Sequence, residues 1–428
     1  MTQPSVAVLA HGLGGSTDLP IPYAYALIGA AWALTLTFAV VVFAWRKPRF
    51  DPDRPGRPLP QWITAAADSP ITRWTVRGLG LLLAVWVVVV GVFGPQNAGN
   101  ALPGAFYVLL WVGVPAASVL IGPVWRLISP LRTIRRLLPV SAPRRYPDTW
   151  GYWPGAAGLL AFVWLELASP DPGSLRAIKI WLACYVVITL GGALLCGQRW
   201  LARADPFEVY SVVASRLAVF GRNHDSGRLT VVNPFNHLLT LPVRPGTVAV
   251  LAVLLGSTAF DSFSASPDWR NFADGLAINP AVTRSVGLVV FVSVVAATFW
   301  GAAQAVGGVD RARRRELPGL MAHSLIPIVV GYVFAHYLSY LVERGQQTVV
   351  ALLGIPGVEV SYVLSAHPSV LATLKVCFVV AGHIAGVVAA HDSAIRLLPK
   401  GHQITGQLMM MLTMVTYTFT GLYLLFGG

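Results

Sequence analysis

Charged residues are scarce in this sequence of 428 residues, because Asp, Glu, Lys and Arg together make up only 11% of it. A soluble domain carries about 25%. Hydrophobic residues make up 55% of the chain, which leaves too little polar surface to cover a water-soluble core. The composition excludes a soluble globular protein. It predicts one all-α integral membrane domain, residues 1–428, with most of its mass in the bilayer.

Cysteine is also rare. Cys184, Cys196 and Cys377 lie within apolar stretches and show no CxxC spacing, so we expect no disulfide framework and interpret them as packing residues. A secretory signal is not expected either, because the first twenty residues lack a basic region and the apolar run 6–10 is short.

The small residues before His11 nevertheless have the pattern of a cleavage site. Cleavage there would leave His11 as a free N-terminus, whose amine and imidazole together can chelate copper. The alternative is that this glycine-rich segment folds back over the outer side of the bundle.

Apolar stretches long enough to cross a bilayer dominate the rest of the sequence. We predict a bundle of about ten spans with short amphipathic helices on its inner surface. The approximate bounds of the spans are 22–45, 76–94, 104–125, 153–169, 177–197, 245–262, 283–305, 319–341, 370–392 and 405–426.

Basic residues concentrate in alternate loops. With these spans, 25 of the 31 Lys and Arg residues fall on one side and 6 on the other. The positive-inside rule then predicts a plasma-membrane protein with both termini outside. The cytoplasmic segments would be 46–75 and 198–244, and the main outer loops 263–282 and 342–369. We attribute the net charge of +13 to topology and to anionic lipids at the inner face, not to nucleic-acid binding.

Two inner segments share a motif. Residues 122–132 and 197–208 both run Gly, Trp, Arg and then a capping residue before proline, a pattern that begins a helix. We predict short amphipathic surface helices over 131–138 and 207–220. The alternative is an inner vestibule lined by Asp205, Glu208 and His237. Proline should keep the linker 46–75 free of regular structure.

Titratable residues within the spans are the candidate functional groups, because charges in a bilayer are costly and need a partner or a use. At a rise of about 1.5 Å per residue, Glu166, Asp261, His336 and Lys375 share one outer layer. His11, Asp18 and His367 lie on adjoining segments. His323 and His391 match in depth near the inner boundary, beside Asp392, and His383 lies alone near the middle.

The motifs now described resemble a family of actinobacterial and archaeal polytopic membrane proteins. They are residues 11–22, 122–130, 204–210, 335–346 and 381–392, and the resemblance extends over nearly the whole chain. Some family members carry the label fenitrothion hydrolase. For this chain, the resemblance implies a membrane-embedded hydrolase of organophosphate triesters.

Three functions remain open from the sequence. The first is a metal-dependent hydrolase with an outward site, in which a divalent ion such as zinc, manganese or copper activates water for attack on an apolar triester. Glu166, Asp261 and Lys375 would be its catalytic groups. Its candidate metal ligands are His11, Asp18, His336, His367 and His383.

The second function is a transporter of a small solute, with Glu166 and Lys375 as a buried gating or proton-coupled pair. The third is a redox protein that holds haem between His323 and His391, or copper at His11.

Overall fold

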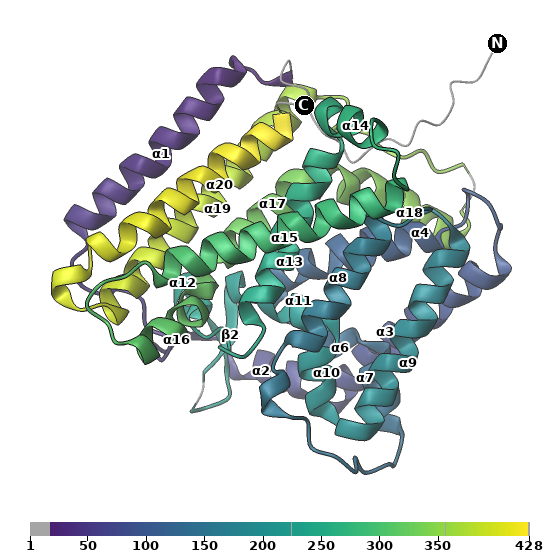
Figure 1. The fold of residues 1–428 in the computed structure, drawn as a ribbon. Helices are drawn as coiled ribbons and strands as arrows, with labels where there is room; N and C mark the ends of the chain where they lie inside the picture. The colour runs from purple at the N-terminus through teal and green to yellow at the C-terminus, as the bar shows by residue number, and fades with distance from the viewer. Residues whose placement is uncertain (1–17, 224, 356, 427–428) are drawn as a thin grey trace.

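The computed structural model describes residues 18–223, 225–355 and 357–426, and its regular structure is almost entirely helical (Figure 1). Within these residues, nine helical stretches have the length and composition of membrane spans. This confirms the predicted all-α bundle of a multi-pass membrane protein. The nine stretches cover 23–44, 70–93, 102–121, 175–196, 247–264, 280–304, 311–353, 368–397 and 405–426.

The tenth predicted span, 153–169, corresponds to α8 (Trp153–Leu167), a helix of 15 residues. At about 1.5 Å per residue it falls short of the roughly 30 Å hydrocarbon core. The count of ten spans therefore stays a prediction.

The C-terminal half forms a layered bundle (Figure 1). Its helices are α13 (Thr247–Ser264), α15 (Pro280–Gln304), α17 (Ile326–Ser339), α19 (Pro368–Leu397) and α20 (Leu408–Phe426). The crossing of α17 and α19 is close because it is made by glycine: a Cβ at Gly331 would lie 2.5 Å from the Phe378 carbonyl oxygen, and small residues are what bring spanning helices together.

Helix α1 (Tyr23–Ala44) lies at the edge of this bundle, against α19 and α20 (Figure 1). It begins where α20 ends, at the end of the molecule that carries α14 (Pro267–Asp274). We call this end the α14 end. The opposite end, which carries a small sheet, is the sheet end.

The N-terminal half packs around a short buried helix, α11 (Pro206–Ala214). Around it lie α8, α10 (Gln198–Ala204) and a long helical stretch made of α4 (Leu102–Gly104), η2 (Ala105–Gly113) and α5 (Val114–Ile121). Every residue of α11 is buried. The prediction of an amphipathic surface helix over 207–220 is therefore wrong, because α11 is covered on all sides and ends at Ala214.

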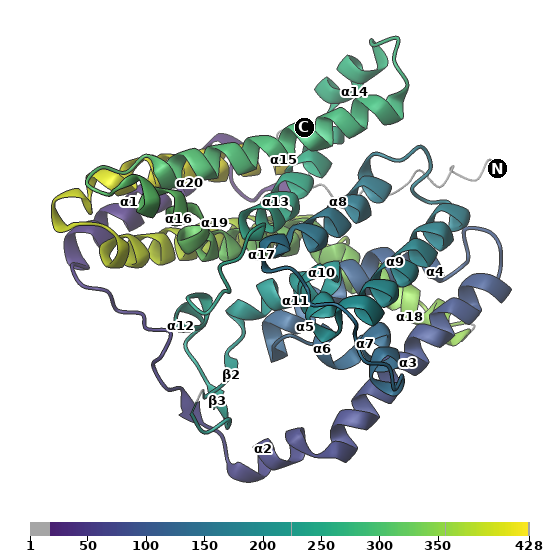
Figure 2. The ribbon, with the colours of Figure 1, turned by 60° about the horizontal axis from the view of Figure 1, so that its bottom comes forward.

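The sheet end contains structure that the sequence did not indicate. Strand β3 (Leu229–Val231) pairs antiparallel with both β1 (Arg57–Pro58) and β2 (Phe220–Arg222), and α2 (Gln61–Asp68) follows β1 (Figure 2). The linker 46–75 is thus not devoid of regular structure. Pro58 lies in β1, which is an edge strand of this sheet. Pro60 stands before α2 and Pro70 at the first position of α3 (Pro70–Phe93), where a missing N–H costs nothing.

The predicted outer loop 342–369 is also partly helical. A π-helix, η6 (Tyr340–Arg344), and α18 (Gly345–Leu353) extend the span of α17. The segment that follows is fastened by the buried carboxylate of Glu343, which accepts hydrogen bonds from the backbone N–H groups of Leu364 and Ser365 at 3.0 and 2.8 Å.

The other described elements are short or peripheral. They are α6 (Trp125–Ile128), α7 (Pro130–Leu137), η3 (Asp148–Trp150), α9 (Leu175–Cys196), η4 (Ser215–Leu217), α12 (Pro234–Leu238), α16 (Arg311–Met321), η5 (Ala322–Leu325), η7 (Lys400–His402) and η8 (Thr405–Gln407).

Candidate functional site

A buried histidine–carboxylate pair lies at the α14 end, where α13 packs against α17. The last turn of α13 holds Asp261 and the last turn of α17 holds His336. The Nε2 atom of His336 lies 2.8 Å from Oδ2 of Asp261, and the two residues are 1% and 6% exposed. The structure therefore joins two residues that the sequence placed only at equal depth.

Two hydroxyl groups extend this pair. The Tyr337 hydroxyl donates to the same Asp261 oxygen at 2.9 Å. On the far side of the ring, Nδ1 of His336 lies 3.4 Å from Oγ of Ser262. Because the carboxylate can only accept, it assigns the ring proton to Nε2 and leaves Nδ1 as the basic nitrogen facing Ser262.

Glu166 adds a second carboxylate to this region. Both of its carboxylate oxygens are buried. The Glu166 carboxylate interacts electrostatically with the side chains of four tyrosine residues: Tyr107, Tyr210, Tyr337 and Tyr340. Asp261 acts on two of the same residues, Tyr337 and Tyr340. The two acids thus share one tyrosine-lined region of the bundle.

Two π-helical segments border this region and contact each other. Segment η2 carries Tyr107, and η6 begins at Tyr340. Pro115 is the second residue after η2, and a proline in a continuous helix clashes with the carbonyl group four residues earlier, which a widened turn relieves. Short π-helical segments occur frequently at functional sites.

Lys375, the third predicted catalytic residue, is 1% exposed on α19. The charge of Asp18 acts on it. Glu166 and Lys375 belong to helices with different main neighbours, because α8 packs on α13, α11 and α10, whereas α19 packs on α17, α1 and α20. Their pairing stays a prediction.

The predicted metal ligands are dispersed. His367 is exposed before α19, with Nδ1 2.9 Å from the Val363 carbonyl oxygen. His383 is fully buried beside Tyr332, with Nδ1 2.9 Å from the Val379 carbonyl oxygen. His11 lies outside the described residues. In the described part of the chain, no three His, Cys, Asp or Glu side chains cluster as metal ligands would.

The predicted haem ligands all have hydrogen-bond partners. His323 lies 3.0 Å from both the Leu320 carbonyl oxygen and the Ser393 hydroxyl. His391 lies 2.7 Å from Oε1 of Gln407 and 3.0 Å from the Trp45 carbonyl oxygen. A haem iron would have to replace one partner on each ring.

The adjacent Asp392 is fully buried and fastens the chain that leaves α1. Its Oδ1 accepts hydrogen bonds from the Arg49 backbone N–H at 2.6 Å and from Nε1 of Trp45 at 3.2 Å. We refer to these contacts, with that of His391 to Trp45, as the α1 latch. The latch holds α1 against α19, so His391 and Asp392 have a structural role.

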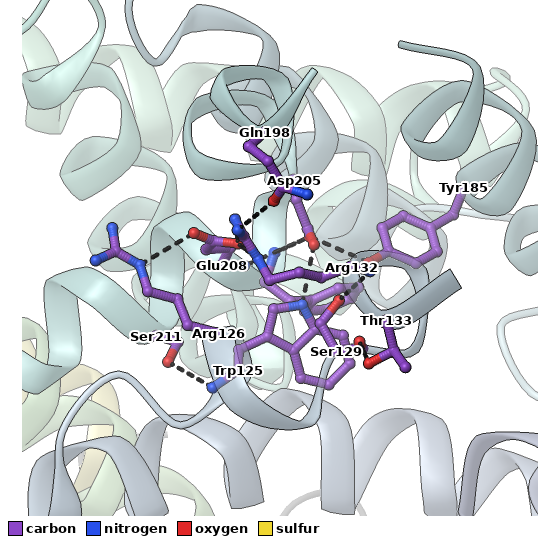
Figure 3. A network of polar contacts seen from close by, with 11 residues as sticks. Trp125, Arg126, Ser129, Arg132, Thr133, Tyr185, Gln198, Asp205, Glu208 and Ser211 are labelled. Atoms are coloured by element: carbon purple, nitrogen blue, oxygen red, sulfur yellow. Dashed lines mark hydrogen bonds and ion pairs between the residues drawn. The ribbon is translucent and has the colours of Figure 1, made fainter. Parts of the chain in front are cut away.

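A second polar network lies toward the sheet end, where the two Gly-Trp-Arg motifs meet (Figure 3). Asp205 caps α11 and also accepts hydrogen bonds from Nε1 of Trp125 at 3.0 Å and from the Tyr185 hydroxyl at 3.1 Å. Glu208 accepts from Nε of Arg126 at 3.0 Å and from Nη2 of Arg132 at 2.5 Å.

Both carboxylates of this network are fully enclosed. Asp205 is 1% exposed and Glu208 is 0% exposed, and His237 bonds elsewhere, to the Ala218 carbonyl oxygen. The alternative of an inner vestibule lined by these three residues is therefore wrong. The two copies of the motif instead form two turns that pack on each other. Trp125 and Arg126 of the first turn bond to the carboxylates of Asp205 and Glu208 in the second.

Asp205 should make stability depend on pH. Burial, and next the Glu208 carboxylate, raise the pKa of Asp205 to about 7 from its ordinary 3.8. A raised folded-state pKa gives stability that is complete below the unfolded pKa and is lost as pH rises through about 7. We expect the melting temperature of the native protein, relative to an Asp205→Asn variant, to fall between about pH 4 and pH 7, the range between the unfolded and folded pKa values. If the melting temperatures of the two proteins change in parallel with pH over this range, the raised pKa of Asp205 is contradicted.

The chain matches no protein-family model, no curated protein and no solved structure.

Proposed function

We propose that this chain is a multi-pass plasma-membrane protein that hydrolyses apolar esters, with His336 and Asp261 as its acid–base pair. The 2.8 Å contact between these buried side chains, next to the Ser262 hydroxyl, carries the proposal. A histidine oriented by a carboxylate and facing a hydroxyl group is the arrangement that activates a nucleophile. The substrate class implied by the family resemblance, an organophosphate triester, has no net charge and can reach the site from the bilayer.

The proposed reaction uses both ring nitrogens of His336. Asp261, held by the Tyr337 hydroxyl, keeps the proton on Nε2. Nδ1 then accepts the proton of Ser262 as Oγ attacks phosphorus, and the P–O bond to the leaving group breaks. The imidazolium returns its proton to the leaving oxygen. Water, deprotonated in turn by Nδ1, attacks phosphorus, the P–Oγ bond breaks, and the imidazolium returns the proton to Oγ of Ser262. General acid–base catalysis of this kind contributes about 10²–10⁴-fold.

A metal ion is not needed in this scheme. His336 and Asp261 would supply two ligands, but a catalytic zinc ion takes three protein ligands, and among the described residues no third His, Cys, Asp or Glu side chain joins them. We therefore derive no step through a metal.

The proposed orientation places the site on the outer side. Arginine-rich segments, including α16 and residues 216–223 and 225–228 around β2, lie at the sheet end. By the positive-inside rule this end would face the cytoplasm and the α14 end would face out.

A phosphotriester that releases p-nitrophenolate tests the proposal. We expect the purified protein in detergent to release p-nitrophenolate, with the same rate in EDTA, and a phosphoryl adduct on the peptide containing Ser262. Ser262→Ala should lose both signals, whereas Ser264→Ala, two residues along the same helix, should keep them. No turnover of either a phosphotriester or a carboxylic ester by the native protein would refute the function.

A proton-coupled permease is the second candidate, favoured by the burial of Lys375 within a span. Buried ionisable residues in spans mark ion pathways by default. In proteoliposomes with a pH gradient, solute uptake that depends on Lys375 would be lost in Lys375→Met and in Glu166→Gln. Uptake indifferent to both changes would remove this candidate.

A further inference from the structure

Helix α3 is the least buried of the candidate spans. Of its 24 residues only Gly91 is buried, and α3 runs along the edge of the molecule (Figure 2). Two glycine residues of α3 make close contacts with neighbouring elements. Near the sheet end Gly80 lies so close to α6 that a Cβ would collide with the Ile128 carbonyl oxygen, and near the α14 end Gly91 packs on Leu102.

Between these two contacts Nε1 of Trp86 donates to the Leu352 carbonyl oxygen at 2.8 Å, and α3 also borders a cleft. A cleft with a volume of about 240 Å³ lies between α3, η2 and α9. Its walls are apolar, for example Leu83 and Val87 of α3, Phe106 of η2 and Val186 of α9. The volume lies below the roughly 300–1,000 Å³ of pockets for drug-sized ligands and suits one narrow aliphatic chain.

Arginine residues gather at the sheet end of this cleft. Arg77 and Arg73 continue the cleft-lining face of α3, three and seven residues before Gly80. Arg132 and Arg136 stand on α7, which packs against α3. Trp74, exposed on α3 beside Arg77, is typical of the headgroup level of a membrane.

The carboxylates in this area do not neutralise all of these cations. Asp68 is shared by Arg73 and Arg222, and Glu208 is shared by Arg126 and Arg132. Among the described residues, Arg77 and Arg136 form no ion pair, and Nε of Arg77 is buried without a hydrogen-bond partner. Helix α7 packs against α3, and burial, then the charges of Arg77 and Arg132, lower the pKa of Arg136 against a smaller opposite effect of Glu208. These guanidinium groups therefore repel one another.

We infer that this cleft binds one acyl chain of an anionic phospholipid, whose phosphate group lies between Arg77 and Arg136. The apolar walls face the hydrocarbon region and the surplus positive charge lies at the level of Trp74, so shape and charge match the two parts of one lipid. The lipid fills the gap along α3 and offsets the repulsion between the arginines. It also covers Tyr185, which lines the cleft and donates to Asp205.

Lipid retention tests the inference. The purified, delipidated protein in detergent receives phosphatidylglycerol, phosphatidylcholine with the same chains, or glycerol phosphate alone. Native mass spectrometry counts the bound molecules and a melting curve gives the stability. We expect one tightly retained phosphatidylglycerol with a raised melting temperature, weaker retention of phosphatidylcholine, and no effect of glycerol phosphate.

Two variants separate the headgroup from the chain. Each basic residue near a membrane surface contributes about fivefold to the affinity for an anionic lipid. The double variant Arg77→Gln with Arg136→Gln should therefore weaken the binding of phosphatidylglycerol by about 25-fold. It should also abolish the preference for phosphatidylglycerol over phosphatidylcholine. Ala84→Trp, which fills the cleft, should reduce retention of both lipids.

The control is Arg54→Gln with Arg57→Gln, which removes the same charge from the exposed linker and should leave the preference intact. Equal retention of the two phospholipids by the native protein overturns the inference. So does a double arginine variant that behaves like the linker control. Binding of glycerol phosphate as tight as that of the lipid would show a phosphate site without an acyl chain and would overturn it as well.

Discussion

His336→Gln is expected to lower the rate of phosphotriester hydrolysis by about 10²–10⁴-fold, the usual contribution of a general acid–base group. The amide can keep a contact with Asp261 but has no basic nitrogen facing Ser262. Initial rates of p-nitrophenolate release, with the melting temperature measured on the same samples, check this. Asp261→Asn should give a comparable loss, because an amide can donate to Nε2 and stabilise the wrong tautomer.

The matched control for this experiment is His367→Gln. His367 is a predicted ligand on the same side of the bundle, but it is exposed and its Nδ1 contacts a backbone carbonyl oxygen. Its substitution should leave the rate within about twofold, since no catalytic proton transfer involves it. Equal rates for the native protein and His336→Gln would rule out the proposed base, and a loss of rate that follows the loss of folded protein would assign His336 a packing role only.

Glu208→Gln should have the largest effect on stability, about 3–5 kcal/mol. The substitution leaves the guanidinium of Arg132 buried without its carboxylate, and an uncompensated buried charge is more costly than the absence of the whole pair. The loss should appear as an earlier transition in denaturant or heat, monitored by tryptophan fluorescence.

Two further variants serve as comparisons for Glu208→Gln. Glu316→Gln removes an exposed pair with Arg313 and should cost no more than about 0.5 kcal/mol. Replacing Glu208 and Arg132 together by leucine should recover most of the stability lost in Glu208→Gln, because well-packed apolar residues can substitute for a buried ion pair. A double variant less stable than the single one would show that the network stabilises the fold beyond pairing.

The shared layer of Asp261 and His336 could be predicted from the sequence, because the rise of a helix per residue is nearly constant. The two side chains do meet in the structure. Rotation about each helix axis could not be predicted in the same way. Tyr337 and Ser262 adjoin the predicted residues in sequence, but only the packing of α13 against α17 brings their hydroxyl groups to the pair.

The errors at the sheet end have a similar origin. The pattern of residues 207–220 resembles an amphipathic helix as long as Glu208 is assumed to face water. Its partners, Arg132 and Arg126, are 76 and 82 residues distant along the chain. A local sequence pattern cannot predict contacts at such a separation. The strands are three residues long at most, which is too short for an alternating pattern to be recognised.

The α1 latch sets an order of events during synthesis. Trp45 and Asp392 are separated by 347 residues, so a chain made at about 5–20 residues per second releases Asp392 roughly 17–70 s after Trp45. Helix α1 is therefore synthesised long before its partner on α19. During that interval it must remain in lipid or be held by an insertion factor. A chain stopped before Asp392 would therefore be found with α1 inserted but not docked.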